Sequence, residues 1–325
     1  MGARAGVAAV TGPPLVVSAN MWLHGHRLLG TSSVVPNLLR PLEVAGQSHT
    51  HFAPDVWLAS YPGGDIDAQL LRVTQGAAAL LLSWEGTQAD PDWRTVEQIR
   101  RRGTRVAVIW WDVSGQPCDA LPVDLHIVHH PEYLRRAADP ARYLLHWIAH
   151  DPAVYHAGGD PVRDLEVVFS GSVGGYRDGR AEHLAALRAA GVVVHVVQTR
   201  ADEPRPEWSA YADLLRRAKI AVNWCIGRSA YPGGGLIDQF KGRVGEACRC
   251  GAMLLEQRNT ETRRWLHPGR DYAEFGGSHE LVQMARFYLD HAADRERIAE
   301  TGARRHAADY TCERWWAPIA ARLGL

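Results

Sequence analysis

Short, unbroken apolar runs that alternate with amphipathic stretches constrain this chain more than any other feature. Runs such as residues 105–111 (RVAVIWW) and 192–197 (VVVHVV) are apolar at nearly every position rather than at every second one. Strands of this kind are buried on both faces, as they are when helices cover a parallel sheet. The pattern recurs on either side of residues 150–164, whose Pro, Gly and Asp content is typical of a linker. The sequence therefore predicts an α/β chain with two parallel, helix-covered sheets.

The expected elements divide the chain into two domains, residues 1–155 and residues 156–325, with the last helix able to cross back to the first domain. The strands expected in the first half are residues 15–20, 55–60, 78–84, 105–112 and 124–130. The strands expected in the second half are residues 165–172, 192–199, 220–225 and 252–257. In such folds ligands bind outside the carboxyl ends of the strands, so the cleft between the two domains is the expected site.

Charge and hydropathy exclude several classes of partner. Lys plus Arg and Asp plus Glu both total 36, so the balanced charge gives no reason to expect nucleic acid as the main partner. No apolar run approaches the ~20 residues that span a bilayer, and we expect no stable membrane insertion. Residues 1–20 are interrupted by Pro13 and Pro14, so they are interpreted as a short tail leading into a strand rather than as a signal peptide. The sequence leaves the oligomeric state open.

The five cysteines are odd in number and scattered along the chain, which favours reduced thiols and a cytosolic protein. Cys248 and Cys250 form a C-x-C pair with no second Cys or His pair at zinc spacing. We interpret them as buried packing thiols and predict no metal site.

The first candidate site follows the strand at residues 165–172, in FSGSVGGYRDGR. Gly171 allows close approach of the backbone to a ligand, Ser172 can donate a hydrogen bond, and Arg180 near a helix start suits a phosphate. A plain glycine turn with solvated arginines is an equally good interpretation of this stretch alone.

The second candidate site is a glycine-rich loop of about twenty residues that ends at Glu246. Loops of this length in compact domains are usually functional or disordered. Lys241 and Arg243 supply cations for a diphosphate, Glu246 can accept hydrogen bonds from two ribose hydroxyls, and Asp238 lies eight positions earlier. We favour this nucleotide-binding interpretation over an exposed loop of mixed charge.

Four residues are candidates in the first half. Asp112 closes a buried strand and should project into the cleft, although it could equally cap a turn. His24 follows the first strand and could act as a base or bind a sugar, but the chain has 16 histidines. Trp84 and Glu85 follow the third strand, where a tryptophan face could line a sugar site. Most of the 12 tryptophans are nevertheless expected in the core.

Other motifs carry little weight. Asp65-Ile66-Asp67 spells D-x-D, but it stands at an expected helix start, where acidic residues are favoured anyway. No G-x-G-x-x-G fingerprint occupies a first strand–helix turn, and there is no Walker A motif or G-x-S-x-G elbow.

The order of segments in the second half resembles the CgeB-like glycosyltransferases, a branch of the group 1 glycosyltransferases. The segments that carry the resemblance are LEVVFSGS with Arg180, YADLLRRAKIAVNW, FKGRVGEACRCGAMLLEQ, and the closing helices that end in YTCERW. The resemblance covers residues 165–316 well and extends weakly into the first half through PDVWLAS and HWIAHDPAVYH.

This resemblance implies a GT-B fold: two Rossmann-like domains whose sheets face an interdomain cleft, with the acceptor on the first and a nucleotide sugar on the second. Glu246 matches the second acid of the family's E-x7-E motif, while Asp238 stands where the first Glu is usual. Lys241 and Arg243 would face the diphosphate. Such enzymes usually need no metal and no cofactor beyond the donor.

The implied reaction is transfer of a glycosyl group from a nucleotide diphosphate sugar to a hydroxyl of a small molecule or glycan. Asp112 and His24 are the candidates for the catalytic base. Two other classes fit the same fold: a non-catalytic sugar-nucleotide-binding protein, and an epimerase or phosphorylase. The donor sugar, the acceptor and the stereochemistry of transfer are left open.

Overall fold

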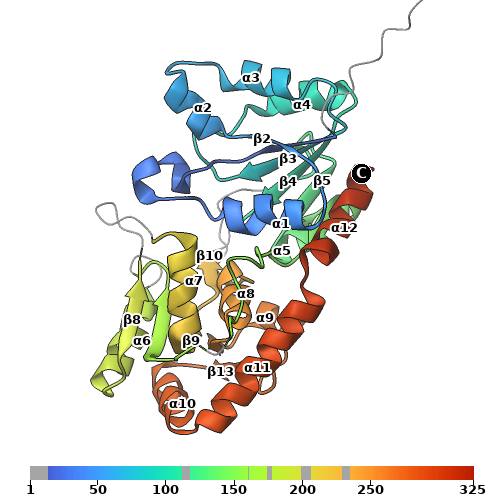
Figure 1. Ribbon diagram of the computed structural model, residues 1–325. Helices are drawn as coiled ribbons and strands as arrows, with labels where there is room; N and C mark the ends of the chain where they lie inside the picture. Colours follow the sequence, from blue (N-terminus) through green and yellow to red (C-terminus); the bar gives the residue numbers. More distant parts are fainter. Residues whose placement is uncertain (1–13, 112–117, 160, 174–177, 199–205, 229–234) are drawn as a thin grey trace, which may run out of the picture.

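Two parallel β-sheets organise the chain, as the unbroken apolar runs predict (Figure 1). The computed structural model describes residues 14–111, 118–159, 161–173, 178–198, 206–228 and 235–325. The first sheet has the order β2-β1-β3-β4-β5-β6 and is built from Thr50–Phe52, Leu15–Ser18, Ala79–Trp84, Arg105–Trp110, Leu125–Val128 and Tyr143–Leu145. The second has the order β13-β12-β9-β7-β8 and is built from Ala273–Phe275, Met253–Gln257, Ala218–Asn223, Leu165–Ser170 and Val194–Val197.

Helices connect the strands and cover both faces of each sheet. Those of the first half are α1 (Arg40–Val44), α2 (Pro54–Ser60), α3 (Ile66–Val73), α4 (Trp93–Arg101) and α5 (Glu132–Arg136). Those of the second half are α6 (Asp178–Ala189), α7 (Trp208–Arg217), α8 (Gly242–Arg249), α9 (Thr260–Trp265), α10 (Ser278–Asp290), α11 (Ala292–Asp309) and α12 (Cys312–Leu323). Short 3₁₀ turns at Leu23–Gly25, Arg27–Leu29 and Pro140–Arg142 and a π-helix at Val35–Leu39 complete the connections, and β10 (Ile226–Arg228) and β11 (Leu236–Asp238) form a small hairpin.

The central strands are buried on both faces, which explains their unbroken apolar runs. In β3, Leu81 packs into one hydrophobic cluster and Leu80 into another on the opposite face of the sheet. Both side chains are fully buried. Removing apolar area of this kind from water is the main favourable contribution to folding.

One expected strand is wrong. Residues 55–60 form helix α2, and the edge position in the first sheet is taken instead by β2. Pro54 occupies the first turn of the helix, where its fixed φ is favourable and its missing N–H costs nothing. Val56 is exposed, so the apolar residues of this run do not form a buried strand.

The chain crosses back to its first half at the end. Helix α12 packs on α1 and β4, lying beside the first sheet in Figure 1. Its Trp316 Nε1 donates to Gln47 Oε1 at 2.9 Å, and Arg322 Nη1 donates to the carbonyls of Ala141 and Tyr143 at 3.1 and 2.9 Å. The boundary between the domains at residue 155 stays a prediction.

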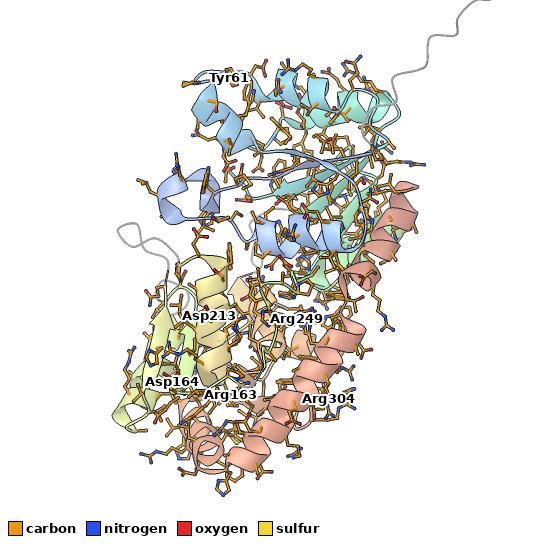
Figure 2. All side chains as sticks on the ribbon, in the orientation of Figure 1. Tyr61, Arg163, Asp164, Asp213, Arg249 and Arg304 are labelled. Atoms are coloured by element: carbon orange, nitrogen blue, oxygen red, sulfur yellow. The ribbon has the colours of Figure 1, made fainter. Side chains whose placement is uncertain are left out.

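A buried histidine fixes the segment between the sheets to the start of α8. His150 Nε2 lies 2.9 Å from the carbonyl oxygen of Gly242, and its ring packs 5.5 Å from that of His306 in α11. Burial lowers the pKa of His150 to about 3, so the ring is neutral and donates this hydrogen bond. Nearby, Arg249, labelled in Figure 2, donates to the carbonyls of Tyr155 and Tyr310, each at 3.3 Å.

We expect Gly245→Ala to destabilise the protein, because residue 245 lies between these two rings. An added Cβ would come within 2.4 Å of His150 Cε1 and 2.5 Å of His306 Nε2. Overpacking of this kind costs about 1–3 kcal/mol of unfolding free energy, measurable by urea denaturation. Gly179→Ala, in α6 with nothing within 4 Å of the new Cβ, is the control and should leave stability unchanged or slightly raised. Equal stability of both variants would contradict this packing.

Candidate active site

Each sheet has one point where the strand order changes direction. In the second sheet, β7 is followed by β8 on one side and β9 on the other. In the first sheet, β1 is followed by β2 on one side and β3 on the other. Helices leaving two such strands go to opposite faces, which opens a crevice at the carboxyl ends where ligands bind. A ligand is therefore expected beside the residues that follow β7 and β9 in the second sheet, or β1 and β3 in the first.

At the crevice of the second sheet, Arg243 lies directly against Gly171. Gly171 has a φ of 145°, and a Cβ at this position would stand 2.5 Å from Arg243 Nη1. Arg243 Nε donates to Asn223 Oδ1, at the end of β9, at 3.1 Å. The planar guanidinium is thus placed across the ends of β7 and β9, where its remaining N–H groups suit the oxygens of a diphosphate. The structure brings the predicted Gly171 and Arg243 together.

Arg180 is in the same region, but its guanidinium is occupied by the backbone. The side chain is buried, and it donates to the carbonyls of Ser172 and Trp224, each at 3.0 Å. It therefore ties the loop after β7 to the loop after β9. The Ser172 residue is exposed beside it. The predicted contact of Arg180 and Ser172 with a phosphate stays a prediction.

Glu246 points into the interior from the second turn of α8 and is only 4% exposed. Its Oε2 accepts a hydrogen bond of 2.9 Å from the hydroxyl of Tyr211 in α7. Its Oε1 lies toward Gly242, where an added Cβ would be 3.2 Å away. Lys241 is the residue that precedes the helix. The acid and the two cations of this segment therefore gather around the first turn of α8.

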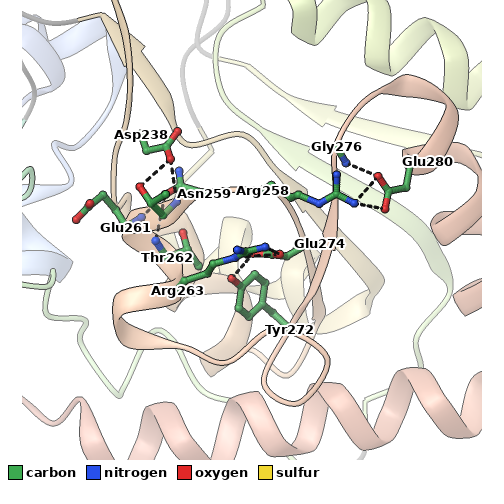
Figure 3. A network of polar contacts seen from close by, with 11 residues as sticks. Asp238, Arg258, Asn259, Glu261, Thr262, Arg263, Tyr272, Glu274, Gly276 and Glu280 are labelled. Carbon is green, nitrogen blue, oxygen red and sulfur yellow. Dashed lines mark hydrogen bonds and ion pairs between the residues drawn. The ribbon is translucent and has the colours of Figure 1, made fainter.

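Asp238 has a structural partner. Its Oδ2 accepts from the backbone N–H and the hydroxyl of Thr260, both at 2.8 Å, at the start of α9 (Figure 3). Asn259 beside it donates to the carbonyls of Cys225 and Gln239, each at 3.0 Å. Together these bonds hold the loop that leads into α8. A donor-binding role for Asp238 stays a prediction, and its present partner is the neighbouring helix.

The structure describes three of the four residues predicted in the first half, His24, Trp84 and Glu85. Asp112 lies outside the described residues. His24 is exposed in a 3₁₀ turn, with a φ of 51° that is unusual for a residue with a side chain. Trp84 stacks on Trp93 at 4.3 Å between ring centroids, so it contributes to packing beneath the edge. Glu85 is next in the chain, at the carboxyl end of β3.

A small cleft lies where the two halves meet, with a cavity volume of about 10 Å³, room for roughly one water molecule. It is lined from the first sheet by Trp110, Trp111, His129, His130 and Tyr133, and from the second half by Gln239, Phe240 and Lys241. His130 hydrogen-bonds to the backbone of Asp238, and burial lowers the pKa of His130 to about 4, so the ring is neutral. The cleft places aromatic faces from β4 and β5 next to the cationic start of α8. The sequence did not single out these aromatic residues, because most of them lie in or next to apolar runs that are equally typical of a hydrophobic core.

Family comparison agrees with this geometry. Residues 164–321 match the family model described as glycosyl transferase-like. The matched segment contains both Gly171 and Glu246. The match confirms the predicted class of enzyme, a glycosyltransferase. No curated protein matches the chain in sequence.

Solved structures share the fold over nearly the whole chain. HepE of Anabaena, in complex with UDP and glucose, superposes with a TM-score of 0.62 at 12% identity, covering 95% of this chain and 99% of that one. Sucrose-phosphate synthase of Thermosynechococcus elongatus gives a TM-score of 0.60 at 14% identity, covering 96% and 97%. AviGT4, a glycosyltransferase involved in avilamycin A biosynthesis, gives 0.61 at 16% identity, covering 96% and 97%. The predicted GT-B fold of this glycosyltransferase is confirmed.

Neither a metal-binding cluster nor a membrane-spanning helix occurs in the described part of the chain. Within the described ranges, no group of three or more His, Cys, Asp or Glu side chains is placed to hold a metal ion. The helices in the same ranges include none that is long and apolar enough to cross a membrane.

The five cysteines are all free, and Cys248 and Cys250 are buried. Burial raises the pKa of the Cys250 thiol to about 12, as expected for a packing thiol.

One acid beneath the crevice of the second sheet was not predicted. Glu256 ends the apolar run of β12, is fully buried, and stands in register with Asn223. Burial raises its pKa to about 7, although Cys225, Asn223 and Arg243 pull it down. Neither carboxylate oxygen has a well-aligned hydrogen-bond partner. A glutamate within an otherwise apolar strand was the only sequence signal.

We expect Glu256→Gln to gain stability relative to the wild type as the pH rises. The pKa of Glu256 is raised from 4.5 to about 7 in the folded protein, so folding favours the neutral form. The unfolding free energy of the wild type should therefore fall as the pH rises from about 5, and the fall should be complete above about pH 7. Between pH 4 and pH 8 the difference in unfolding free energy between variant and wild type should shift by up to about 3 kcal/mol in favour of glutamine.

The matched control is Glu274→Gln, on the neighbouring strand. Burial raises the pKa of Glu274, but hydrogen bonds from Arg263 and Tyr272 outweigh it and lower the pKa overall. This variant should therefore lose stability relative to the wild type as the pH rises through the acid range. The same pH dependence for both variants, measured by urea denaturation, would refute the assignment of Glu256.

Proposed function

We propose that this glycosyltransferase moves a sugar from a uridine diphosphate sugar to the hydroxyl of a small-molecule or glycan acceptor. The observation that carries the proposal is the placement of Arg243 against Gly171 and Asn223 at the crevice of the second sheet. A cation fixed at this point can bind the diphosphate and stabilise the charge that develops on it as the glycosidic bond breaks. Side-chain cations would then perform the task for which other enzymes use a metal.

Glu246 supplies the second part of the donor site. Its carboxylate is buried and oriented by the Tyr211 hydroxyl. A buried acid of this kind binds a vicinal pair of hydroxyls well, because each hydroxyl can donate to one carboxylate oxygen. Glu246 would therefore hold the ribose while Arg243 and Lys241 hold the diphosphate.

The choice of uridine is supported by structural neighbours. The HepE structures contain UDP, UDP with glucose, or UDP-glucose. A DNA-modifying β-glucosyltransferase with the same fold, at 11% identity and a TM-score of 0.60, was solved in the presence and absence of uridine diphosphoglucose. The finer resemblance to CgeB-like enzymes supports a donor site of group 1 type in the second half.

Two further features belong to the proposal. The free cysteines support a reducing, cytosolic setting for the protein. Trp111, half-buried at the end of β4, supports binding of the acceptor by the first half, because a flat apolar face packs well against sugar rings and other ring systems.

The proposal is tested by incubating the protein with UDP-, GDP- and dTDP-sugars and measuring release of the nucleoside diphosphate and formation of a glycosylated product. Turnover of a UDP-sugar with transfer to a hydroxyl is the expected result. Binding without turnover would instead indicate a sugar-nucleotide-binding protein. Isomerisation of the sugar nucleotide without an acceptor would indicate an epimerase, and glycosyl transfer that depends on inorganic phosphate would indicate a phosphorylase. A protein that binds none of these nucleotides would refute the proposal.

We expect Arg243→Ala to weaken binding of UDP at least tenfold, as measured by calorimetry. A hydrogen bond to a charged group contributes about 1.5–3 kcal/mol, and loss of the guanidinium removes at least one such bond. Arg217→Ala is the matched control, because Arg217 forms an exposed ion pair with Asp164 away from the crevice. Unchanged UDP affinity in Arg243→Ala would show that the diphosphate is not bound at this position.

A further inference from the structure

A buried polar cluster lies on one face of the second sheet, next to Arg243. Glu256 is the register partner of Asn223 in the parallel pair of β12 and β9. Neighbouring strands are about 4.8 Å apart, so the two side chains stand beside each other on the same face. Asn223 Nδ2 donates to Cys225 Sγ at 3.0 Å, and all three side chains are buried.

Asn223 connects this cluster to the cation of the crevice. Its Oδ1 accepts from Arg243 Nε at 3.1 Å, while its Nδ2 is used by Cys225. The amide is therefore oriented from both ends. Helix α8, which carries Arg243 in its first turn, packs on both β9 and β12. One side chain thus separates the guanidinium from the face of the sheet that carries the carboxyl of Glu256.

The titratable and charged groups around Glu256 come from every element packed against this face. They are Arg243 and Cys248 on α8, Cys225 after β9, and Tyr272 and Glu274 at β13. Burial raises the pKa of both thiols and of the Tyr272 hydroxyl, so these groups are neutral. Hydrogen bonds from Arg263 and Tyr272 keep Glu274 ionised. Arg243 is therefore the cation whose charge Glu256 can balance.

A ligand on Arg243 changes the electrostatics of Glu256. In the empty site, burial raises the pKa of Glu256 to about 7, while Cys225, Asn223 and the positive charge of Arg243 lower it. A diphosphate bound to Arg243 offsets that positive charge and adds negative charge close to the carboxylate. Both effects favour the protonated carboxyl.

We propose that Glu256 takes up a proton from solvent when the diphosphate of the donor binds Arg243, and releases it when the nucleoside diphosphate leaves. This inference rests on the proposed function. In the empty site the carboxylate is the counter-charge of the guanidinium, and in the occupied site the diphosphate takes over this task. The proton converts the carboxylate to a neutral carboxyl, and no other bond is made or broken.

Glu256 is thus a positioning residue that acts on the ligand through Asn223 and Arg243. Its ionised form competes with the diphosphate for the charge of Arg243. The affinity for the nucleoside diphosphate should therefore fall as the pH rises above 7, which favours release of this product.

The first experiment counts protons in the wild type, so it needs no variant. UDP is titrated into the protein at pH 8 by calorimetry, in two buffers that differ in their enthalpy of ionisation. The terminal phosphate of UDP has a pKa of about 6 and is fully ionised at this pH, so it contributes no proton. We expect uptake of about 0.4 proton per UDP, the value for a tenfold change in the proton affinity of Glu256. UDP binding without proton uptake would overturn the inference and leave the proposed function intact.

The second experiment compares the UDP affinity of Glu256→Gln with that of the wild type at pH 6 and pH 8. Glutamine resembles the protonated carboxyl, so the two dissociation constants should agree within about twofold at pH 6. At pH 8 the variant should bind at least about threefold more tightly, and it should take up no proton. A purely structural role of Glu256 predicts instead the same ratio at both pH values, and that result would overturn the inference.

The matched control is Glu97→Gln, an exposed glutamate paired with Arg101 on α4. It should show the affinity and the proton uptake of the wild type at both pH values. A wild type that binds no UDP would overturn the proposed function, and this inference with it.

Discussion

The guanidinium of Arg243 can lie across the ends of β7 and β9 only because residue 171 has no side chain. The Nη1 atom occupies the space that a Cβ would need, and the φ of Gly171 belongs to a region that other residues rarely adopt. Several further groups hold this contact in place. Asn223 orients the guanidinium from one side, and Arg180 ties the two flanking loops together from below. The cation is therefore held in place before any ligand arrives, which reduces the ordering cost of binding.

Fixing a cation in a partly buried site has an electrostatic cost, and Glu256 is the adjacent group that can respond to it. A fully buried carboxyl with a pKa of about 7 is near the point where it can be neutral or charged. An anionic diphosphate bound by Arg243, as we propose, would compensate the positive charge that favours ionisation of Glu256, so the neutral form of Glu256 would become more favourable. The crevice can thus accept a doubly charged ligand without collecting an excess of negative charge beneath it.

The fold was accessible from the sequence because its signal is local and repeated. Continuous apolar runs identified β3, β4, β7 and β9 within a few residues, since burial on both faces leaves no alternation to misinterpret. The error at residues 55–60 has the same origin. Val56, Trp57 and Leu58 look like a buried strand, but Pro54 and the bonds of Asp55 to the loop after β1 make the segment a helix near the surface.

The site was only partly accessible, because the decisive facts are contacts between distant segments. The sequence identifies Gly171, Arg243 and Glu246 as plausible ligand-binding residues, but it does not say that Gly171 exists to admit Arg243. It assigns Arg180 and Asp238 to the ligand, whereas the structure gives both of them partners within the protein. It places Glu85 at a strand end, but the burial of its Oε1 atom depends on how β1 and β3 lie side by side.

The two crevices are linked by the segment that follows β1. Asp55 fixes the start of this segment beside Asn20, and further along Thr31 accepts a hydrogen bond of 3.2 Å from Trp208 Nε1 at the start of α7. Helix α7 carries Tyr211, which orients Glu246. Asp55 and Glu246 are therefore the two ends of one short series of contacts that crosses between the halves. Relative motion of the halves would have to break the hydrogen bond between Trp208 and Thr31, so the fold itself holds the loop after β1 next to the helix that orients Glu246.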